Sequence, residues 1–278
     1  MVDAFGLWEL NFPCSRVDDD DDEEEQITKE QEEQLCPQFV FSPQFSKDVG
    51  KTEPIECSVL VLGVGEVAST FLEVHFLCGN NSSVAAVISD KKTEKNFEYL
   101  VKNLRNKRSS LLHQLTRNND VMVCQISSHV EQDKVFYWTQ KIFSHIRPAK
   151  VVILTSSPAS EYNSDDPSEI KTDFVKMMKT NAWSNSCAGP DITYIQTPNT
   201  VKGLAASVLT HCQIYKLPAA LFMCYTESMH VDAQAVEAFR VLFGVKDLFR
   251  GIEQAHAEDA ARLMKTVGTG AQPNNLYM

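Results

Sequence analysis

The fold is decided by residues 57–68, CSVLVLGVGEVA, where an apolar run meets two closely spaced glycines. The β-branched and leucine residues from 57 to 62 predict a buried β-strand. Gly63 and Gly65 end this strand, and the apolar spacing over residues 67–77 predicts a helix directly after the turn. A buried strand that passes through a tight turn into a helix is the repeating unit of α/β proteins.

The same alternation of strand and helix continues along the chain. Further buried strands are expected at residues 84–88, 121–126, 151–154 and 219–225. Helices are expected at 91–117, 135–146, 203–215 and 258–267, with one more that begins after the N-cap residue Asp232. This pattern predicts an α/β fold with a mostly parallel central sheet flanked by helices.

The negative charge is concentrated at the N-terminus. Of the 37 acidic and 26 basic residues, 15 and 4 lie in residues 1–54, so that 22 of each remain in residues 55–278. Eight consecutive carboxylates at 18–25 repel one another and predict a disordered acidic arm over residues 1–54. The apolar islands 5–8 and 39–41 flank these carboxylates, and each is either a docking peptide or a segment that packs on the domain.

Composition excludes several classes of protein. The neutral region 55–278 lacks the broad basic surface of a nucleic-acid-binding protein. No apolar run reaches the length of a membrane span, and the N-terminus does not have the pattern of a signal peptide. The eight cysteines form no CxxC pair and are expected to be free thiols, so a cytoplasmic or nuclear location is expected.

Enzyme motifs are sparse. Gly63, Gly65 and Ala68 fit G-x-G-x-x-A, and Asp90 ends the next expected strand, so a Rossmann-like NAD(P)-binding protein is the alternative interpretation. Glu66, however, would place a carboxylate where a pyrophosphate should bind. The chain has no G-x-S-x-G or H-E-x-x-H motif, and its seven histidines share no metal-ligand spacing. No enzymatic activity, cofactor or metal site is therefore expected.

The C-terminus carries a more informative pattern. Leu276, Tyr277 and Met278 form a hydrophobic-Tyr-any-residue ending after a segment rich in Gly, Pro and Asn, so residues 268–278 are predicted to be a flexible docking tail and residues 55–267 the folded domain. The tyrosine ring offers a large apolar anchor, and the terminal carboxylate can pair with a buried lysine in a receiving pocket.

Several segments resemble the family of 20S proteasome assembly chaperones. The residues that carry the resemblance are 206–220 (ASVLTHCQIYKLPAA), 221–229 (LFMCYTESM), 236–239 (VEAF) and 275–278 (NLYM), with a weaker match over 137–162. The good match covers about the last 80 residues and is fairly specific, and the acidic N-terminal arm also suits the family.

The resemblance implies a non-enzymatic α/β protein that forms a heterodimer with a second subunit, proteasome assembly chaperone 2. It implies that the pair binds the α-type subunits of the 20S proteasome α-ring, helps them to join and blocks off-pathway ring dimers. Leu276, Tyr277 and Met278 would be the docking residues, entering a pocket between neighbouring α-subunits. The domain is also expected to expose an apolar patch for its partner subunit, at a place that the sequence does not give.

Overall fold

The structure is a computed structural model in which part of the chain is described. The described residues are 35–45, 54–78, 82–89, 97–102, 109–116, 118–126, 129–164, 173–184, 192–227, 231–245, 248, 249, 252, 254 and 256–270.

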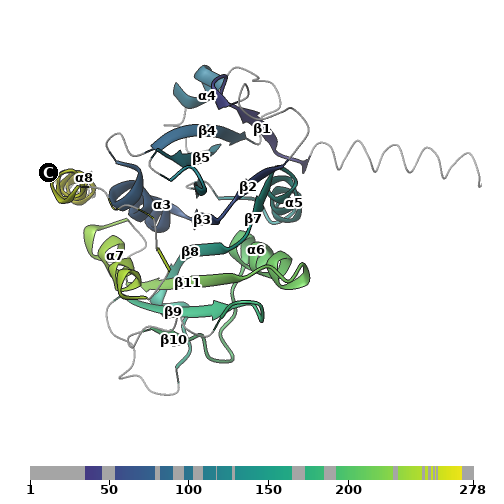
Figure 1. Cartoon of the computed structure of the whole chain (residues 1–278). Helices are drawn as coiled ribbons and strands as arrows, with labels where there is room; N and C mark the ends of the chain where they lie inside the picture. Colours follow the sequence, from purple (N-terminus) through teal and green to yellow (C-terminus); the bar gives the residue numbers. More distant parts are fainter. Residues whose placement is uncertain are drawn as a thin grey trace, which may run out of the picture.

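A large mixed β-sheet forms the centre of the described domain (Figure 1). Its order is β1-β4-β5-β6-β3-β8-β11-β9-β10. The bounds are β1 Gln38–Phe41, β3 Val59–Val64, β4 Ser82–Ser89, β5 Ser109–Leu115, β6 Val121–Ile126, β8 Val151–Pro158, β9 Phe174–Lys179, β10 Thr193–Tyr194 and β11 Ala219–Thr226. A small separate sheet pairs β2 (Ile55–Cys57) with β7 (Ile146–Pro148) in parallel.

Parallel pairing is concentrated in the middle of the large sheet. The neighbours β6, β3, β8 and β11 all run in the same direction. The pairs β1·β4, β4·β5, β5·β6 and β9·β11 are antiparallel, and the short edge strand β10 pairs with β9 in parallel. The predicted class of a central sheet flanked by helices is confirmed, and its parallel order belongs to the four strands at the centre.

The two faces of the sheet bury separate hydrophobic clusters because side chains alternate along each strand. In β3, Val61 belongs to one cluster, whereas Leu60 and Leu62 belong to the other. All eight residues of β11 are buried, which is typical of a strand covered by helices on both faces.

Different helices cover the two faces (Figure 1). One face packs against α5 (Val135–His145) and α6 (Gly203–Ile214). The other packs against α3 (Glu66–Leu72), the π-helical segment η1 (Glu73–Leu77), α7 (Ala233–Ala238), the 3-10 helix η6 (Phe239–Gly244) and α8 (Ala257–Gly270). Two further short helices are α4 (Phe97–Lys102) and the 3-10 helix η3 (Ala159–Glu161).

The predicted strands at 57–62, 84–88, 121–126, 151–154 and 219–225 correspond to β3, β4, β6, β8 and β11. The predicted N-cap is also present, because the Asp232 carboxylate accepts a hydrogen bond from the Ala235 N–H at 2.7 Å. The helix expected at 91–117 is wrong in its second half, where β5 bonds to strands on both sides. Leu112 of β5 is fully buried, so the pairing outweighs local helix propensity.

The ends of the domain also differ from the predicted boundaries. Residues 38–41, assigned to the acidic arm, form β1 and pair with β4. Phe39 and Phe41 pack on His145 of α5, with ring centroids 4.5 and 5.6 Å apart, so this island folds onto the domain. At the other end, α8 continues to Gly270, so residues 268–270 of the predicted tail are helical. The island at 5–8 and the carboxylates at 18–25 lie outside the described residues.

Candidate functional site

The glycine pattern lies in the turn between β3 and α3. Gly65 has a φ of 93°, a left-handed conformation that favours glycine over residues with a Cβ. Its N–H donates to the Ile126 carbonyl oxygen at 2.8 Å, so this donor is already used within the protein. Asp90, the expected ribose partner, lies outside the described residues.

Gly63 allows α3 to pack closely on the sheet. A Cβ at this position would lie 2.5 Å from Leu72 Cδ1 and 3.2 Å from the Ala68 backbone. The Ser69 hydroxyl donates to the Gly63 carbonyl oxygen at 3.1 Å and ties the first turns of the helix to the strand. Glu66 lies in the first turn of α3, where its carboxylate interacts favourably with the helix dipole. This carboxylate would repel a pyrophosphate bound at the same place. The geometry therefore explains the glycines by packing and gives no support to the NAD(P)-binding alternative.

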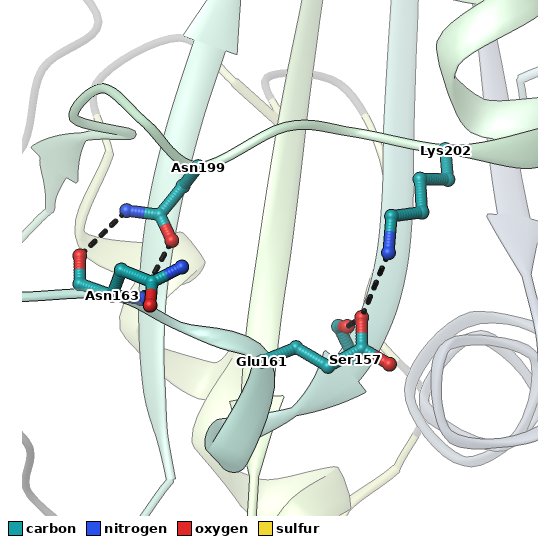
Figure 2. Close-up of polar contacts among 5 residues, drawn as sticks. All are labelled: Ser157, Glu161, Asn163, Asn199 and Lys202. Atoms are coloured by element: carbon teal, nitrogen blue, oxygen red, sulfur yellow. Dashed lines mark hydrogen bonds and ion pairs between the residues drawn. The ribbon is translucent and has the colours of Figure 1, made fainter.

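A polar cluster lies at the carboxyl end of β8 (Figure 2). The Asn163 N–H donates to Asn199 Oδ1 at 2.7 Å, and Asn199 Nδ2 donates back to the Asn163 carbonyl oxygen at 2.8 Å. Ser157 Oγ donates to Glu161 Oε2 at 3.2 Å, and Lys202 Nζ lies 3.6 Å from the same oxygen. The exposed ion pair contributes little stability, so the cluster mainly holds the segment before α6 against the end of β8.

Two buried histidines are held in the neutral form. Nε2 of His113 lies 3.1 Å from Gln125 Oε1, and Gln125 Nε2 donates to the Ser69 carbonyl oxygen at 2.9 Å. Burial lowers the pKa of His113 to about 4. His75 packs against Phe71 with ring centroids 4.8 Å apart, and burial lowers its pKa as well. These contacts give both rings a packing role.

The buried cysteines are inert thiols. Burial raises the pKa of Cys57, Cys212 and Cys224 to about 12, and it also raises the pKa of Cys124. A thiol with a raised pKa is a poor nucleophile and a poor metal ligand at neutral pH. The six cysteines in the described ranges are free, as predicted for those positions. Within those ranges, no His, Cys, Asp and Glu side chains cluster as a metal site, and no helix has the length and hydrophobicity of a membrane span.

The surface over α5 and α6 exposes large apolar side chains. Among the described residues, the exposed large apolar side chains are Phe136, Tyr194, Ile214 and Tyr215. Phe136 belongs to α5, Ile214 ends α6, and Tyr215 follows directly, whereas Tyr194 lies on the edge strand β10. Ile214 is 68% exposed and Tyr215 is 65% exposed, which is unusual for adjacent large apolar residues.

A ladder of aromatic rings connects the two helices at this surface. Phe143 of α5 stacks on His211 of α6 with ring centroids 4.2 Å apart, and His211 lies 4.4 Å from Tyr215. Thr139 Oγ1 and Ser207 Oγ form a hydrogen bond of 2.9 Å one turn earlier, so the two helices run side by side in the same direction. The sequence predicts that the domain exposes an apolar patch but does not predict where the patch lies. The spacing of apolar residues in α6 does not show which side of the helix the sheet covers.

The predicted docking residues Leu276, Tyr277 and Met278 lie outside the described residues. The chain approaches them from α8, whose Met264 packs on the cluster beneath α3 and α7. Helix α8 therefore belongs to the face of the sheet opposite α5 and α6 (Figure 1).

Comparison with known proteins shows similarity along nearly the whole chain. A family model described as "Proteasome assembly chaperone 4" matches residues 14–278. The chain is 95% identical to proteasome assembly chaperone 1 of Nematostella vectensis over 253 residues, which cover 91% of this chain and 98% of that protein. It is 29% identical to proteasome assembly chaperone 1 of Xenopus laevis over 240 residues, covering 82% of this chain and 79% of the relative.

Solved structures share the fold at much lower identity. The Pyrococcus furiosus protein PbaA, described as an archaeal homolog of proteasome-assembly chaperone, aligns with a TM-score of 0.54 at 11% identity over 83% of this chain and 87% of its own. PbaB of the same organism, described as an archaeal proteasome activator, aligns with a TM-score of 0.52 at 9% identity over 84% and 96%. Because the family match reaches from residue 14 to 278, the chain belongs to the proteasome assembly chaperone 1 family.

Proposed function

We propose that this chain is a non-enzymatic chaperone subunit that pairs with proteasome assembly chaperone 2 and docks on the α-ring of the 20S proteasome through Leu276, Tyr277 and Met278. The pair would help α-type subunits to join and would block off-pathway ring dimers in the cytoplasm and nucleus. The observation that carries the proposal is the family match, which extends to the last residue of the chain.

The chemistry of the last three residues supports a docking role. The Tyr277 ring can fill an apolar pocket while its hydroxyl stays at the polar rim, and the free carboxylate of Met278 can pair with a cation. The buried cysteines and histidines described above have packing roles, and the glycine turn uses its own donor internally. These contacts support binding rather than catalysis.

The test measures the affinity of the full chain, in complex with its partner subunit, for purified α-rings. Tyr277→Ala should weaken binding about tenfold or more, because a buried aromatic anchor contributes ~2 kcal/mol. Adding one residue after Met278 should have the same effect, because it displaces the carboxylate. Gln272→Ala is the control within the same segment and should bind normally. Unchanged affinity after both changes at the terminus would refute the tail as the docking element.

A further inference from the structure

Helices α5 and α6 are unusually poor in charge for a surface layer. Val135–His145 and Gly203–Ile214 contain no acidic residue and one lysine, Lys141, which is half-buried. By contrast, α8 on the opposite face carries Glu258, Asp259, Arg262 and Lys265. Depletion of charge together with exposed aromatic residues is typical of the centre of a stable subunit interface.

The adjacent exposed residues Ile214 and Tyr215 lie at the C-terminal end of α6, whereas the exposed Phe136 lies at the start of α5. The rings of Phe143, His211 and Tyr215 form a continuous ladder, and the exposed Ile214 lies beside it at the end of α6. Burial lowers the pKa of His211, so the ladder is uncharged at neutral pH. Adjacent apolar side chains that are about two-thirds exposed make a good anchor for a partner.

The first described residues of the chain lie close to this end of the helices. Phe39 of β1 packs on His145 at the C-terminal end of α5, and the described chain starts only four residues earlier, at Leu35. The sequence before Leu35 contains the eight consecutive carboxylates at 18–25. Two copies that met through this surface would bring two such arms together, and the repulsion would oppose self-association.

We propose that the α5–α6 surface, centred on Phe143, His211, Ile214 and Tyr215, binds the second chaperone subunit, whose contacting surface is apolar at its centre and basic at its border, opposite in charge to the acidic arm of this chain. This inference rests on the proposed function, because it assigns a surface to the partner named there. It places the partner on the face opposite α8, so that one chain can hold its partner and extend its C-terminal tail at the same time.

The test uses the full chain co-expressed with proteasome assembly chaperone 2, with the affinity measured by titration and the mass by light scattering. The double substitution Ile214→Glu with Tyr215→Glu should weaken the complex at least tenfold, because it places two carboxylates in an apolar contact. Both positions are exposed, so the melting temperature of the isolated chain should hardly change. Tyr194→Glu, at an exposed aromatic residue on β10, is the matched control and should bind normally.

Deletion of residues 1–34 should weaken the complex and reduce its dependence on salt, because the carboxylates that attract the basic border of the partner subunit are lost. Unchanged binding after this deletion would refute the basic border. Unchanged binding by the double glutamate variant would overturn the assigned surface.

The proposal would also be overturned if the α5–α6 surface were found to bind either of two other segments or molecules. One is a second copy of this chain, seen as a homodimer that the double glutamate variant dissociates. The other is the acidic arm itself, seen as hydrogen-exchange protection of α5 and α6 in the isolated chain that is lost on deletion of residues 1–34. Binding to α-rings through Tyr277 is measured in parallel. If the wild-type chain binds the partner subunit and the double glutamate variant binds it equally well, this inference alone is refuted. If the wild-type chain does not bind the partner subunit, heterodimerisation and this inference are refuted together.

Discussion

At the scale of single residues, Gly63 carries a steric constraint that can be measured. Gly63→Ala would place a Cβ 2.5 Å from Leu72 Cδ1 and 3.2 Å from the Ala68 backbone, so the buried Leu72 side chain must move and α3 must shift slightly away from β3. We expect the free energy of unfolding to fall by about 1–3 kcal/mol, the usual cost of overpacking a well-filled core. Chemical denaturation followed by circular dichroism measures this change.

Gly244→Ala is the matched control for this substitution. A Cβ at Gly244 meets no atom within 4 Å. The added methyl group should therefore leave stability nearly unchanged or raise it slightly, because it restricts the unfolded chain. Equal destabilisation by the two substitutions would contradict the packing explanation of the glycine pattern.

His113 should make stability depend on pH. Its pKa is about 4 in the folded protein, compared with 6.5 for an unperturbed histidine, because burial disfavours the charged ring. Between these values the unfolded chain binds a proton that the folded chain does not bind. The stabilising contribution is therefore complete above pH 6.5 and is lost as the pH falls towards 4, by up to ~3 kcal/mol for a shift of this size.

The measurement is the free energy of unfolding of wild type and His113→Gln between pH 7 and 4. The wild type should lose more stability than the variant over this range, because glutamine has no proton to gain. The exposed His256 provides the control, and His256→Gln should follow the wild-type curve. Parallel curves for wild type and His113→Gln would exclude His113 as the source of the slope.

At the scale of elements, β1 is the first segment of the chain that we expect the folded domain to require, and the acidic residues before it are expected to be dispensable for folding. Deletion of residues 1–34 leaves β1 in place, so cooperative unfolding and the melting temperature should be retained. Deletion of residues 1–45 removes β1, exposes the edge of β4 and takes Phe39 and Phe41 away from His145. We expect the longer deletion to cost about 2 kcal/mol or more, because each half-buried phenylalanine contributes roughly half of its full transfer free energy.

Thermal unfolding of the two truncated proteins distinguishes these effects. Similar melting temperatures for both deletions would show that β1 contributes nothing to stability. A large loss from the shorter deletion alone would show instead that residues before β1 are part of the folded unit.

The central strands could be predicted from the sequence because each is a continuous apolar run that is buried on both faces, as in β3 and β11. Strand β5 could not, because serine, histidine and glutamine interrupt its leucines and its pairing depends on distant residues in β4 and β6. The short edge strand β10 has two residues and no pattern to detect. The exposure of Ile214 and Tyr215 likewise depends on where the sheet lies, which helix periodicity alone does not specify.

At the scale of the whole molecule, the α5–α6 surface and helix α8 lie on opposite faces of one sheet (Figure 1). We therefore expect binding to the partner subunit and binding of the tail to be energetically separate. Tyr277→Ala should weaken α-ring binding and leave the affinity for the partner subunit unchanged. The double glutamate variant at Ile214 and Tyr215 should weaken partner binding alone.

A double-mutant cycle measures whether the two sites interact. The combined variant should show a coupling free energy within about 0.5 kcal/mol of zero for each binding reaction, as for distant independent sites. The affinity for α-rings is measured with a saturating concentration of the partner subunit. Variants that bind the partner more weakly then still reach the ring as a pair, so that only their effect on ring binding is measured. A coupling well above this range would show that the two faces communicate through the sheet.

The margins of the sheet also limit how these molecules meet one another in solution. An open strand edge invites backbone pairing with another chain, which leads to aggregates or fibrils. Here one margin is β10, only two residues long, and the other is β1, preceded in sequence by eight consecutive carboxylates. The first offers too short a template for a neighbouring strand, and the second brings like charges together. We therefore expect little edge-to-edge association through the described strands at either margin.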